Sequence, residues 1–178
     1  MIESRRENYQ DHYIAASDDK IAIINESNCL TATVLHRPNI WMLHHIREDI
    51  VVFESVLHPG HYLDMNHEKH WDRHVQRVTQ HDGLPESETW AQFRVRGTSP
   101  DGVTLPDDVA LQSCRWPDRW LDTHEDLRLY GTKSPNQPKN DPNFENTDDW
   151  ARFVIHDVTL PSGTGTDDPS PAPSQSRL

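Results

Sequence analysis

The sequence predicts an all-β fold in which three similar units, each of about four short strands, share one core. A segment of two short strands joined by a Pro-containing turn occurs twice. A Trp-centred segment follows each copy at a similar distance, and degenerate copies of both segments precede them. The 13 Pro residues among 178 also favour many turns and few long helices.

The first repeated segment covers residues 53–64 and 111–122, which align without gaps as FESVLHPGHYLD and LQSCRWPDRWLD. Their shared pattern is apolar-x-Ser-x-x-x-Pro-x-x-aromatic-Leu-Asp. We interpret each copy as a strand, a turn containing Pro, and a second strand. Residues 13–15 are a weaker copy of the second strand.

The second repeated segment reads WAQFRV at residues 90–95 and WARFVI at residues 150–155. We interpret WMLHHI at residues 41–46 as a degenerate copy. Tyr13 and Tyr62 are separated by the same number of residues as Trp41 and Trp90. Two independent segments that keep one spacing indicate a period of about 50 residues.

A third strand is expected between these segments in each unit, at residues 20–24 and 127–130 and, in the middle unit, between Lys69 and Val78. The units then cover about residues 5–48, 49–98 and 108–158 of a single domain, residues 1–160. Residues 161–178 contain no aromatic residue and are rich in Pro, Ser and Thr, so a disordered tail is predicted.

Three units that cannot each bury a face must pack against one another. A closed barrel capped by hairpins, with pseudo-threefold symmetry, does this and hides most strand edges. This arrangement of about twelve short strands is the β-trefoil. A seven-stranded sandwich is the alternative, but it does not explain a threefold repeat.

The formal net charge is −12 and no cluster of Lys or Arg stands out, which argues against nucleic acid and anionic membranes as partners. Apolar residues make up 34% of the chain, so the core must rely on large side chains such as the six Trp. Cys29 and Cys114 are too few for a disulfide framework. Two buried free thiols are the simpler interpretation, and one disulfide is the alternative.

Residues 1–7 lack the apolar segment of a signal peptide, and no apolar run approaches the ~20 residues that cross a bilayer. We therefore expect a cytoplasmic protein, one exported by a non-classical route, or a piece cut from a longer precursor.

The repeated Ser-x-x-x-Pro-x-x-aromatic-Leu unit resembles the arabinofuranose-binding (AbfB-type) carbohydrate-binding domain, a β-trefoil family. The resemblance covers most of residues 50–156 and, weakly, residues 9–46. It implies a lectin-like, non-catalytic module that binds carbohydrate, at most an accessory part of a glycoside hydrolase. Residues 53–63 also resemble the interleukin-1 cytokine family, which implies a protein-interaction β-trefoil of cytokine or scaffold type as the alternative. That motif normally stands once in cytokines and stands twice here, so the first resemblance is favoured.

The chain departs from the AbfB-type pattern at the sugar pocket. In that family the second strand continues as Leu-Arg-His and the His contributes to the pocket, whereas the matching positions here read Asp64-Met65 and Asp122-Thr123. The family's pocket Asp matches the positions of Trp90 and Trp150. Specificity for arabinose is therefore not expected.

Candidate sugar-binding residues are carboxylates that orient hydroxyls, their polar neighbours, and an aromatic that covers an apolar ring face. In the third unit they are Asp122, His124, Asp148, Asp149 and Trp116, and in the second Asp64, Asn66 and His67. The expected affinity is about millimolar to micromolar per site, with avidity from two or three sites.

Several other residues admit two interpretations. On a helix, His67, His70 and His74 would face one metal ion, but a polar loop with exposed His is favoured, and no cofactor is expected. Paired Asp residues such as Asp148-Asp149 suggest a glycosidase, but adjacent carboxylates point apart, so solvated turns are favoured and no catalysis is expected. Trp41, Trp90 and Trp150 are interpreted as core residues rather than as sugar platforms. Trp116 is either the ligand-facing aromatic or packed on its own hairpin.

Overall fold

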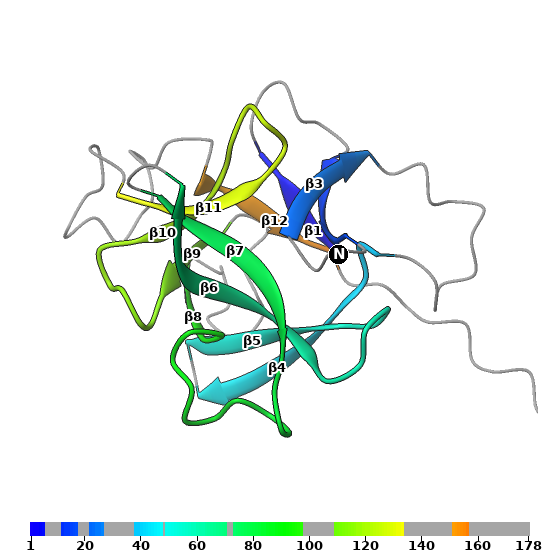
Figure 1. The fold of residues 1–178 in the computed structure, drawn as a ribbon, viewed down its shortest axis with the longest axis vertical. Helices are drawn as coiled ribbons and strands as arrows, with labels where there is room; N and C mark the ends of the chain where they lie inside the picture. Colours follow the sequence, from blue (N-terminus) through cyan, green and yellow to red (C-terminus); the bar gives the residue numbers. More distant parts are fainter. Residues whose placement is uncertain are drawn as a thin grey trace, which may run out of the picture.

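The computed structural model describes residues 1–5, 12–17, 22–26, 38–47, 49–70, 73–97, 109–133 and 151–156. Twelve strands lie within these ranges, and they fall in chain order into three groups of four (Figure 1). The first group is β1 (Ile2–Ser4), β2 (His12–Ala16), β3 (Ala22–Glu26) and β4 (Trp41–Arg47). The second is β5 (Ile50–Ser55), β6 (His61–His70), β7 (Arg73–Gln80) and β8 (Phe93–Arg96). The third is β9 (Ala110–Ser113), β10 (Trp120–Thr123), β11 (Leu129–Thr132) and β12 (Phe153–Ile155).

The outer strands of the units pair with one another to form a barrel. Antiparallel pairs β12–β1, β4–β5 and β8–β9 join one unit to the next. Within units, β5 pairs with β8, and a bridge between Val109 and Phe153 joins β9 to β12. The barrel order is therefore β1, β12, β9, β8, β5, β4.

The two inner strands of each unit form a hairpin. These hairpins are β2–β3, β6–β7 and β10–β11. Their second strands, β3, β7 and β11, contact one another, so the three hairpins meet at one end of the barrel. A six-stranded barrel capped by three hairpins is a β-trefoil, and the predicted fold class is confirmed.

One hydrogen bond repeats in all three units and shows the pseudo-threefold symmetry directly. In each case the residue after a unit's first strand donates its N–H to the carbonyl just before a last strand. The pairs are Arg5 to Arg152 (2.9 Å), Val56 to Ile40 (3.2 Å) and Cys114 to Gln92 (3.0 Å).

The Ser of the repeated pattern closes the turn that follows it. Ser55 Oγ accepts the N–H of His58, and Ser113 Oγ accepts the N–H of Trp116, both at 3.1 Å. Ser4 ends β1 at the equivalent position and is buried like the other two. Residues 2–4 are thus a third copy of apolar-x-Ser, which lies ahead of the expected start of the first unit near residue 5.

The strand register corrects one alignment made from the sequence. Trp41 pairs with Ser55, as Phe93 pairs with Ser113 and Phe153 with Ser4. Trp41 is therefore equivalent to these two Phe residues and not to Trp90 and Trp150, because the degenerate copy is shifted by three positions.

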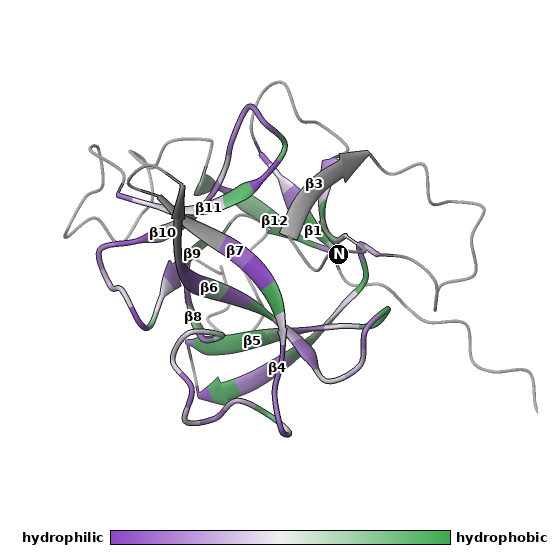
Figure 2. Ribbon diagram, in the orientation of Figure 1, coloured by the Kyte–Doolittle hydropathy of each residue, from purple (hydrophilic) through white to green (hydrophobic). Residues whose placement is uncertain are grey.

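The barrel interior holds the main core cluster. Trp41, Phe93 and Phe153 are all buried in it, and the Phe53 and Phe93 rings lie 6.2 Å apart. The Trp41 indole N–H donates to the Ile14 carbonyl at 2.8 Å, so its polar atom is satisfied inside the core. In Figure 2 the barrel strand β5 is hydrophobic over most of its length.

The expected third strands are present but displaced. β7 occupies the window expected in the middle unit, whereas β3 and β11 each begin two residues after the predicted starts. Cys114 is half-buried and free, and burial raises the pKa of its thiol. Cys29 and the predicted tail, residues 161–178, lie outside the described residues. No helix in the described ranges has the length and apolar character needed to cross a membrane.

Candidate functional site

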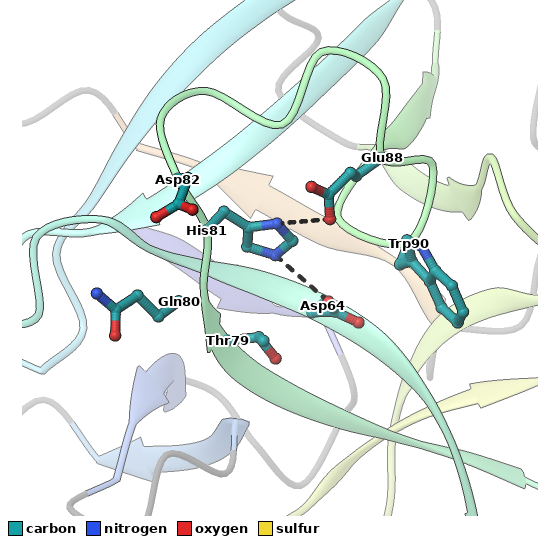
Figure 3. Close-up of a pocket in the computed structure, with 7 residues that line it drawn as sticks. All are labelled: Asp64, Thr79, Gln80, His81, Asp82, Glu88 and Trp90. Atoms are coloured by element: carbon teal, nitrogen blue, oxygen red, sulfur yellow. Dashed lines mark ion pairs between the residues drawn. The ribbon is translucent and has the colours of Figure 1, made fainter.

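A pocket of about 600 Å³ lies in the second unit, beside the β6–β7 hairpin (Figure 3). Its wall combines carboxylates, one imidazole, small polar side chains and one indole. The lining residues are Asp64, Thr79, Gln80, His81, Asp82, Glu88 and Trp90. Three carboxylates and no Lys or Arg line it among the described residues.

The hairpin register sets two sides of the pocket. β6 and β7 pair so that Tyr62 faces Thr79, which places Asp64 near the residues at the end of β7. His81 follows β7 directly, and its N–H donates to the Gly60 carbonyl at 3.0 Å. Gly60 has a φ of 75°, a left-handed conformation that favours glycine. The turn before β6 therefore holds the backbone of His81.

The loop between β7 and β8 supplies the third side. The Met65 N–H donates to the Trp90 carbonyl at 3.1 Å, which attaches this loop to β6. The buried Gln92 side chain donates its amide to the carbonyls of Pro85 and Glu86, at 2.8 and 2.7 Å. These bonds shape the loop that carries Glu88 and Trp90.

The His81 ring lies between two carboxylates (Figure 3). Its Nδ1 is 2.9 Å from Glu88 Oε2, and its Nε2 is 3.5 Å from Asp64 Oδ2. The His81 side chain is only 5% exposed, and its Nε2 makes no hydrogen bond. Burial raises the pKa of Asp64, and the nearby His81 opposes this without reversing it. Asp64 is thus a desolvated carboxyl group beside a buried imidazole.

A second layer of residues supports His81. The Tyr62 ring packs edge-on against it, with ring centres 5.6 Å apart. Glu54 accepts the Gly60 N–H at 2.8 Å and contacts His44 Nε2 at 2.7 Å. Burial and the neighbouring Glu54 carboxylate raise the pKa of Tyr62. The side of the pocket formed by His81 is therefore backed by a connected polar and aromatic network.

An aromatic cluster lies beside the pocket, where the second and third units meet. The Trp90 ring contacts His67 at 4.3 Å and Trp116 at 6.0 Å between ring centres, both nearly perpendicular. His67 and Trp116 are 5.3 Å apart. The Arg115 guanidinium lies 4.9 Å from the centre of the Trp90 ring. Predicted candidates from two different units, His67 and Trp116, are thus brought together.

The third unit has a related carboxylate in a different setting. Asp122 takes the position of Asp64, and its Oδ2 accepts the Thr132 hydroxyl at 2.8 Å. His124 lies in the following turn, where its Nδ1 is 3.2 Å from Asp126 and its ring packs edge-on against Tyr130. Trp116 lies with the second unit's aromatic cluster instead.

The remaining sequence candidates are placed as follows. Asn66 is half-buried in β6, next to the exposed His67. Asp148, Asp149 and Trp150 lie outside the described residues. His67 and His70 lie in β6 and His74 lies in β7, so the helical spacing of these three residues is not realised. Among the described residues, no group of three His, Cys, Asp or Glu side chains is arranged to hold a metal ion.

Several residues that line the pocket, chiefly His81, Glu88 and Trp90, are not among the candidates that the sequence indicates. The repeat predicts Trp90 in the core, but Trp90 is half-buried and lines the pocket, and Phe93, three residues later, is the core residue. A signal was present, since Glu88-x-Trp90 matches Asp148-x-Trp150. No sequence signal points to His81, because only the pairing of β6 with β7 brings His81 close to Asp64.

No protein-family model matches the chain, and no curated protein matches it in sequence. Among solved structures, a designed threefold-symmetric protein, ThreeFoil, superposes with a TM-score of 0.61 at 11% identity, over 88% of this chain and 96% of that one.

Two of the similar structures are enzymes that act on sugars. An arabinofuranosidase complexed with arabinofuranosyl-α-1,2-xylobiose superposes with a TM-score of 0.58 at 18% identity, over 86% of this chain. A GlcNAcα1-4Gal-releasing endo-β-galactosidase from Clostridium perfringens has a TM-score of 0.56 at 11% identity, over 85% of this chain. The chain spans 29% and 30% of these two enzymes. By fold, this chain is a β-trefoil similar to ThreeFoil and to part of the arabinofuranosidase.

Proposed function

We propose that this chain is a non-catalytic carbohydrate-binding module and that its sugar site is the pocket of the second unit. The observation that carries the proposal is the set of hydrogen-bonding groups, Asp64, His81 and Glu88, beside the indole of Trp90. Carboxylates and imidazole bind sugar hydroxyls, and an indole covers the apolar face of a sugar ring. The structural likeness to part of an arabinofuranosidase supports this proposal.

The arrangement of the carboxylates favours binding over hydrolysis. A glycosidase places its two carboxyl groups on either side of the scissile bond. Here the His81 ring lies between Asp64 and Glu88 and contacts both, so it occupies the space in which such a bond would lie. We therefore assign no catalytic residue.

Residues beside the pocket extend the proposed site. The exposed His67 and the half-buried Trp116 adjoin Trp90 and would contact a second sugar residue of an oligosaccharide. Asn66 lies on the same strand as Asp64. A second site in the third unit, built on Asp122, His124, Asp148 and Asp149, remains a separate hypothesis.

A protein-interaction module is the alternative function, and the described surface favours it less. Large exposed apolar side chains in the described ranges are Met42, Leu84 and Leu127. They lie on β4, in the β7–β8 loop and in the β10–β11 turn, so they come from three separate elements. A flat protein interface normally has an apolar centre.

The test is a glycan array followed by isothermal titration of the sugars that bind. We expect affinities between about millimolar and micromolar, typical of shallow sites. His81→Ala and Trp90→Ala should abolish binding. His45→Ala, which removes an exposed histidine of β4, is the matched control and should bind as the unmodified protein does. No sugar response, together with a specific protein partner, would establish the alternative.

A further inference from the structure

His81 contacts a carboxylate through each of its two ring nitrogens (Figure 3). Nδ1 lies 2.9 Å from Glu88 Oε2, and Nε2 lies 3.5 Å from Asp64 Oδ2. The two carboxylates belong to different elements, because Asp64 lies on β6 and Glu88 lies in the loop between β7 and β8. The His81 ring therefore links this loop to the β6–β7 hairpin.

Both contacts are attractive only while the three groups hold one proton more than a neutral imidazole supplies. A neutral ring carries a single N–H, so one ring nitrogen presents a lone pair to a carboxylate oxygen, whichever nitrogen keeps the proton. The imidazolium form of His81 carries two N–H groups and satisfies both carboxylates. A proton on Asp64 has the same effect, and burial raises the pKa of that carboxyl group.

The other titratable groups around His81 do not supply this proton. They are Tyr62 and His67 on β6, Glu54 on β5, and Asp82, which follows His81 in the chain. Burial and the Glu54 carboxylate raise the pKa of Tyr62, so its hydroxyl stays neutral. His67 packs on Trp90, and its charge favours the ionised form of Asp64. In the ranges that the structure describes, no Lys or Arg lines the pocket.

Burial decides which contact is lost when the proton leaves. The Asp64 side chain is 9% exposed, whereas the Glu88 side chain is 51% exposed. Water hydrates Glu88 readily and Asp64 poorly, so the remaining N–H stabilises the protein most next to Asp64. Glu88 then separates from His81, and the loop that carries Glu88 and Trp90 loses one of its attachments to the hairpin.

We propose that the proton shared by Asp64, His81 and Glu88 attaches the β7–β8 loop to the β6–β7 hairpin, so that sugar binding is strongest at mildly acidic pH and weakens towards about pH 8. This inference rests on the proposed carbohydrate-binding function and adds its regulation by pH. Histidine is the side chain whose charge ordinarily changes between about pH 5 and about pH 8. The loop supplies Glu88 and Trp90 to the pocket, so its detachment removes one polar and one aromatic contact with the sugar.

The first experiment follows the loop of the full-length protein without any ligand. NMR hydrogen exchange gives protection factors for the Met65 N–H, which donates to the Trp90 carbonyl, and for the Ala91 N–H, which donates to the Glu88 carbonyl. Both factors should fall by about tenfold between about pH 5.5 and about pH 8, as expected for the loss of one hydrogen bond to a charged group. The Val56 N–H, which bonds outside this loop, is the internal reference and should keep its protection.

Glu88→Gln separates the effect of the proton from a change in loop packing. The Gln amide accepts from a protonated ring through its oxygen and donates to a neutral ring through its nitrogen, so the loop stays attached at both pH values. The fall in protection should therefore disappear in Glu88→Gln, and also in His81→Gln, whose new side chain does not titrate. Glu86→Gln is the matched control, because Glu86 is an exposed residue of the same loop and does not line the pocket. It should show the same fall as the unmodified protein.

The second experiment titrates the protein with D-galactose, D-glucose, D-xylose and L-arabinose at the same two pH values. These sugars carry no group that titrates in this range, so any pH dependence of binding belongs to the protein. We expect the dissociation constant of a sugar that binds to rise by about tenfold at the higher pH. In Glu88→Gln the dissociation constant should be the same at both pH values.

The outcomes separate this inference from the function on which it rests. Protection that does not change with pH in the unmodified protein overturns the proton-dependent attachment and leaves the carbohydrate-binding proposal in place. An equal fall in Glu88→Gln overturns the assignment to Glu88. A fall in protection with an unchanged sugar affinity overturns the regulation of binding. Failure of every sugar on the glycan array to bind, with the fall in protection intact, overturns the proposed function and leaves the attachment of the loop.

Discussion

The second and third units each have an aspartate at the equivalent position of the equivalent strand, Asp64 in β6 and Asp122 in β10, but the two side chains have different surroundings. Asp64 and Asp122 follow an aromatic-Leu pair, and both are buried. In the third unit the Thr132 hydroxyl donates to Asp122 from the adjacent strand, β11. In the second unit the equivalent threonine, Thr79, lines the pocket with Asp64, which faces His81. The comparison shows how equivalent positions of a symmetric scaffold serve packing in one unit and a pocket in another.

The largest expected effect is a difference in unfolding free energy between two substitutions in the Trp-Ala-x-Phe segment, one in the core and one at the pocket. Phe93→Ala should cost about 3–5 kcal/mol of unfolding free energy, because Phe93 is fully buried in the barrel. Trp90→Ala should cost about 1 kcal/mol, because Trp90 is half-buried at the pocket. Urea denaturation measures both, and equal losses would contradict the assignment of Phe93, and not Trp90, to the core.

A smaller effect concerns how the hairpins of the two units pack against each other. Gly131 in β11 takes the position of Val78 in β7, and a Cβ added there would lie 2.5 Å from the sulfur of Met65. Gly131→Val should therefore cost about 1–3 kcal/mol through overpacking. Met65→Ala in the same chain should recover part of this loss. A double-mutant cycle by chemical denaturation checks the coupling, and strictly additive effects would refute it.

The pocket carboxyl should make stability depend on pH. Burial raises the pKa of Asp64 above its unfolded value, although His81 and His67 lower it and Glu88 raises it further. The folded state therefore binds the proton more tightly. The contribution of Asp64 to the free energy of unfolding is therefore most favourable below the pKa that Asp64 has in the unfolded state. It decreases as the pH rises through the pKa that Asp64 has in the folded state.

Denaturation of the unmodified protein and of Asp64→Asn across about pH 3 to about pH 7 tests this dependence. The stability of the unmodified protein relative to Asp64→Asn should decrease with rising pH. Asp82→Asn, at an exposed position of the same pocket, is the matched control and should show a weaker trend. A difference between the unmodified protein and Asp64→Asn that increases with pH would contradict the pKa direction.

The smallest expected effect lies in the β10–β11 turn. Leu127 has a φ of 62°, a left-handed conformation that is unfavourable for a residue with a branched side chain, and it is 44% exposed. Leu127→Asn should stabilise the protein by about 0.5–1 kcal/mol, because Asn tolerates this conformation. Leu127→Ala keeps the Cβ strain and should bring no such gain. A loss of thermal stability in Leu127→Asn would indicate that Leu127 makes a packing contribution that outweighs the strain.

Much of the fold could be predicted from the sequence, because the repeated residues form turns and strands through contacts with residues close to them in the chain. The Ser of the pattern accepts an N–H three residues later, which requires only the turn itself. The first unit is harder to align from the sequence, because Trp41 takes the core position that Phe93 and Phe153 take in the other units. A sequence alignment therefore matches Trp41 to the wrong residues, Trp90 and Trp150.

The site was only partly predictable. Asp64, His67 and Trp116 were chosen because they lie in or near the repeated pattern, and the structure places them at or beside the pocket. Asp122 and His124 were chosen by the same logic, but they lie in a different environment, in the third unit. Sequence position alone does not distinguish Asp64 from Asp122.

The amino-acid sequence was sufficient for the number of units, the strand-turn-strand pattern within them and the barrel that they imply, because these depend on neighbouring residues and on repetition. The meeting of Asp64, His81 and Glu88 depended on the tertiary structure. Their proximity arises from the β6–β7 register and from a loop attached to β6 by one backbone hydrogen bond. The strand register and the position of this loop set the burial and the hydrogen-bond partners of a side chain, and these decide whether a carboxylate supports the fold or lines a binding pocket.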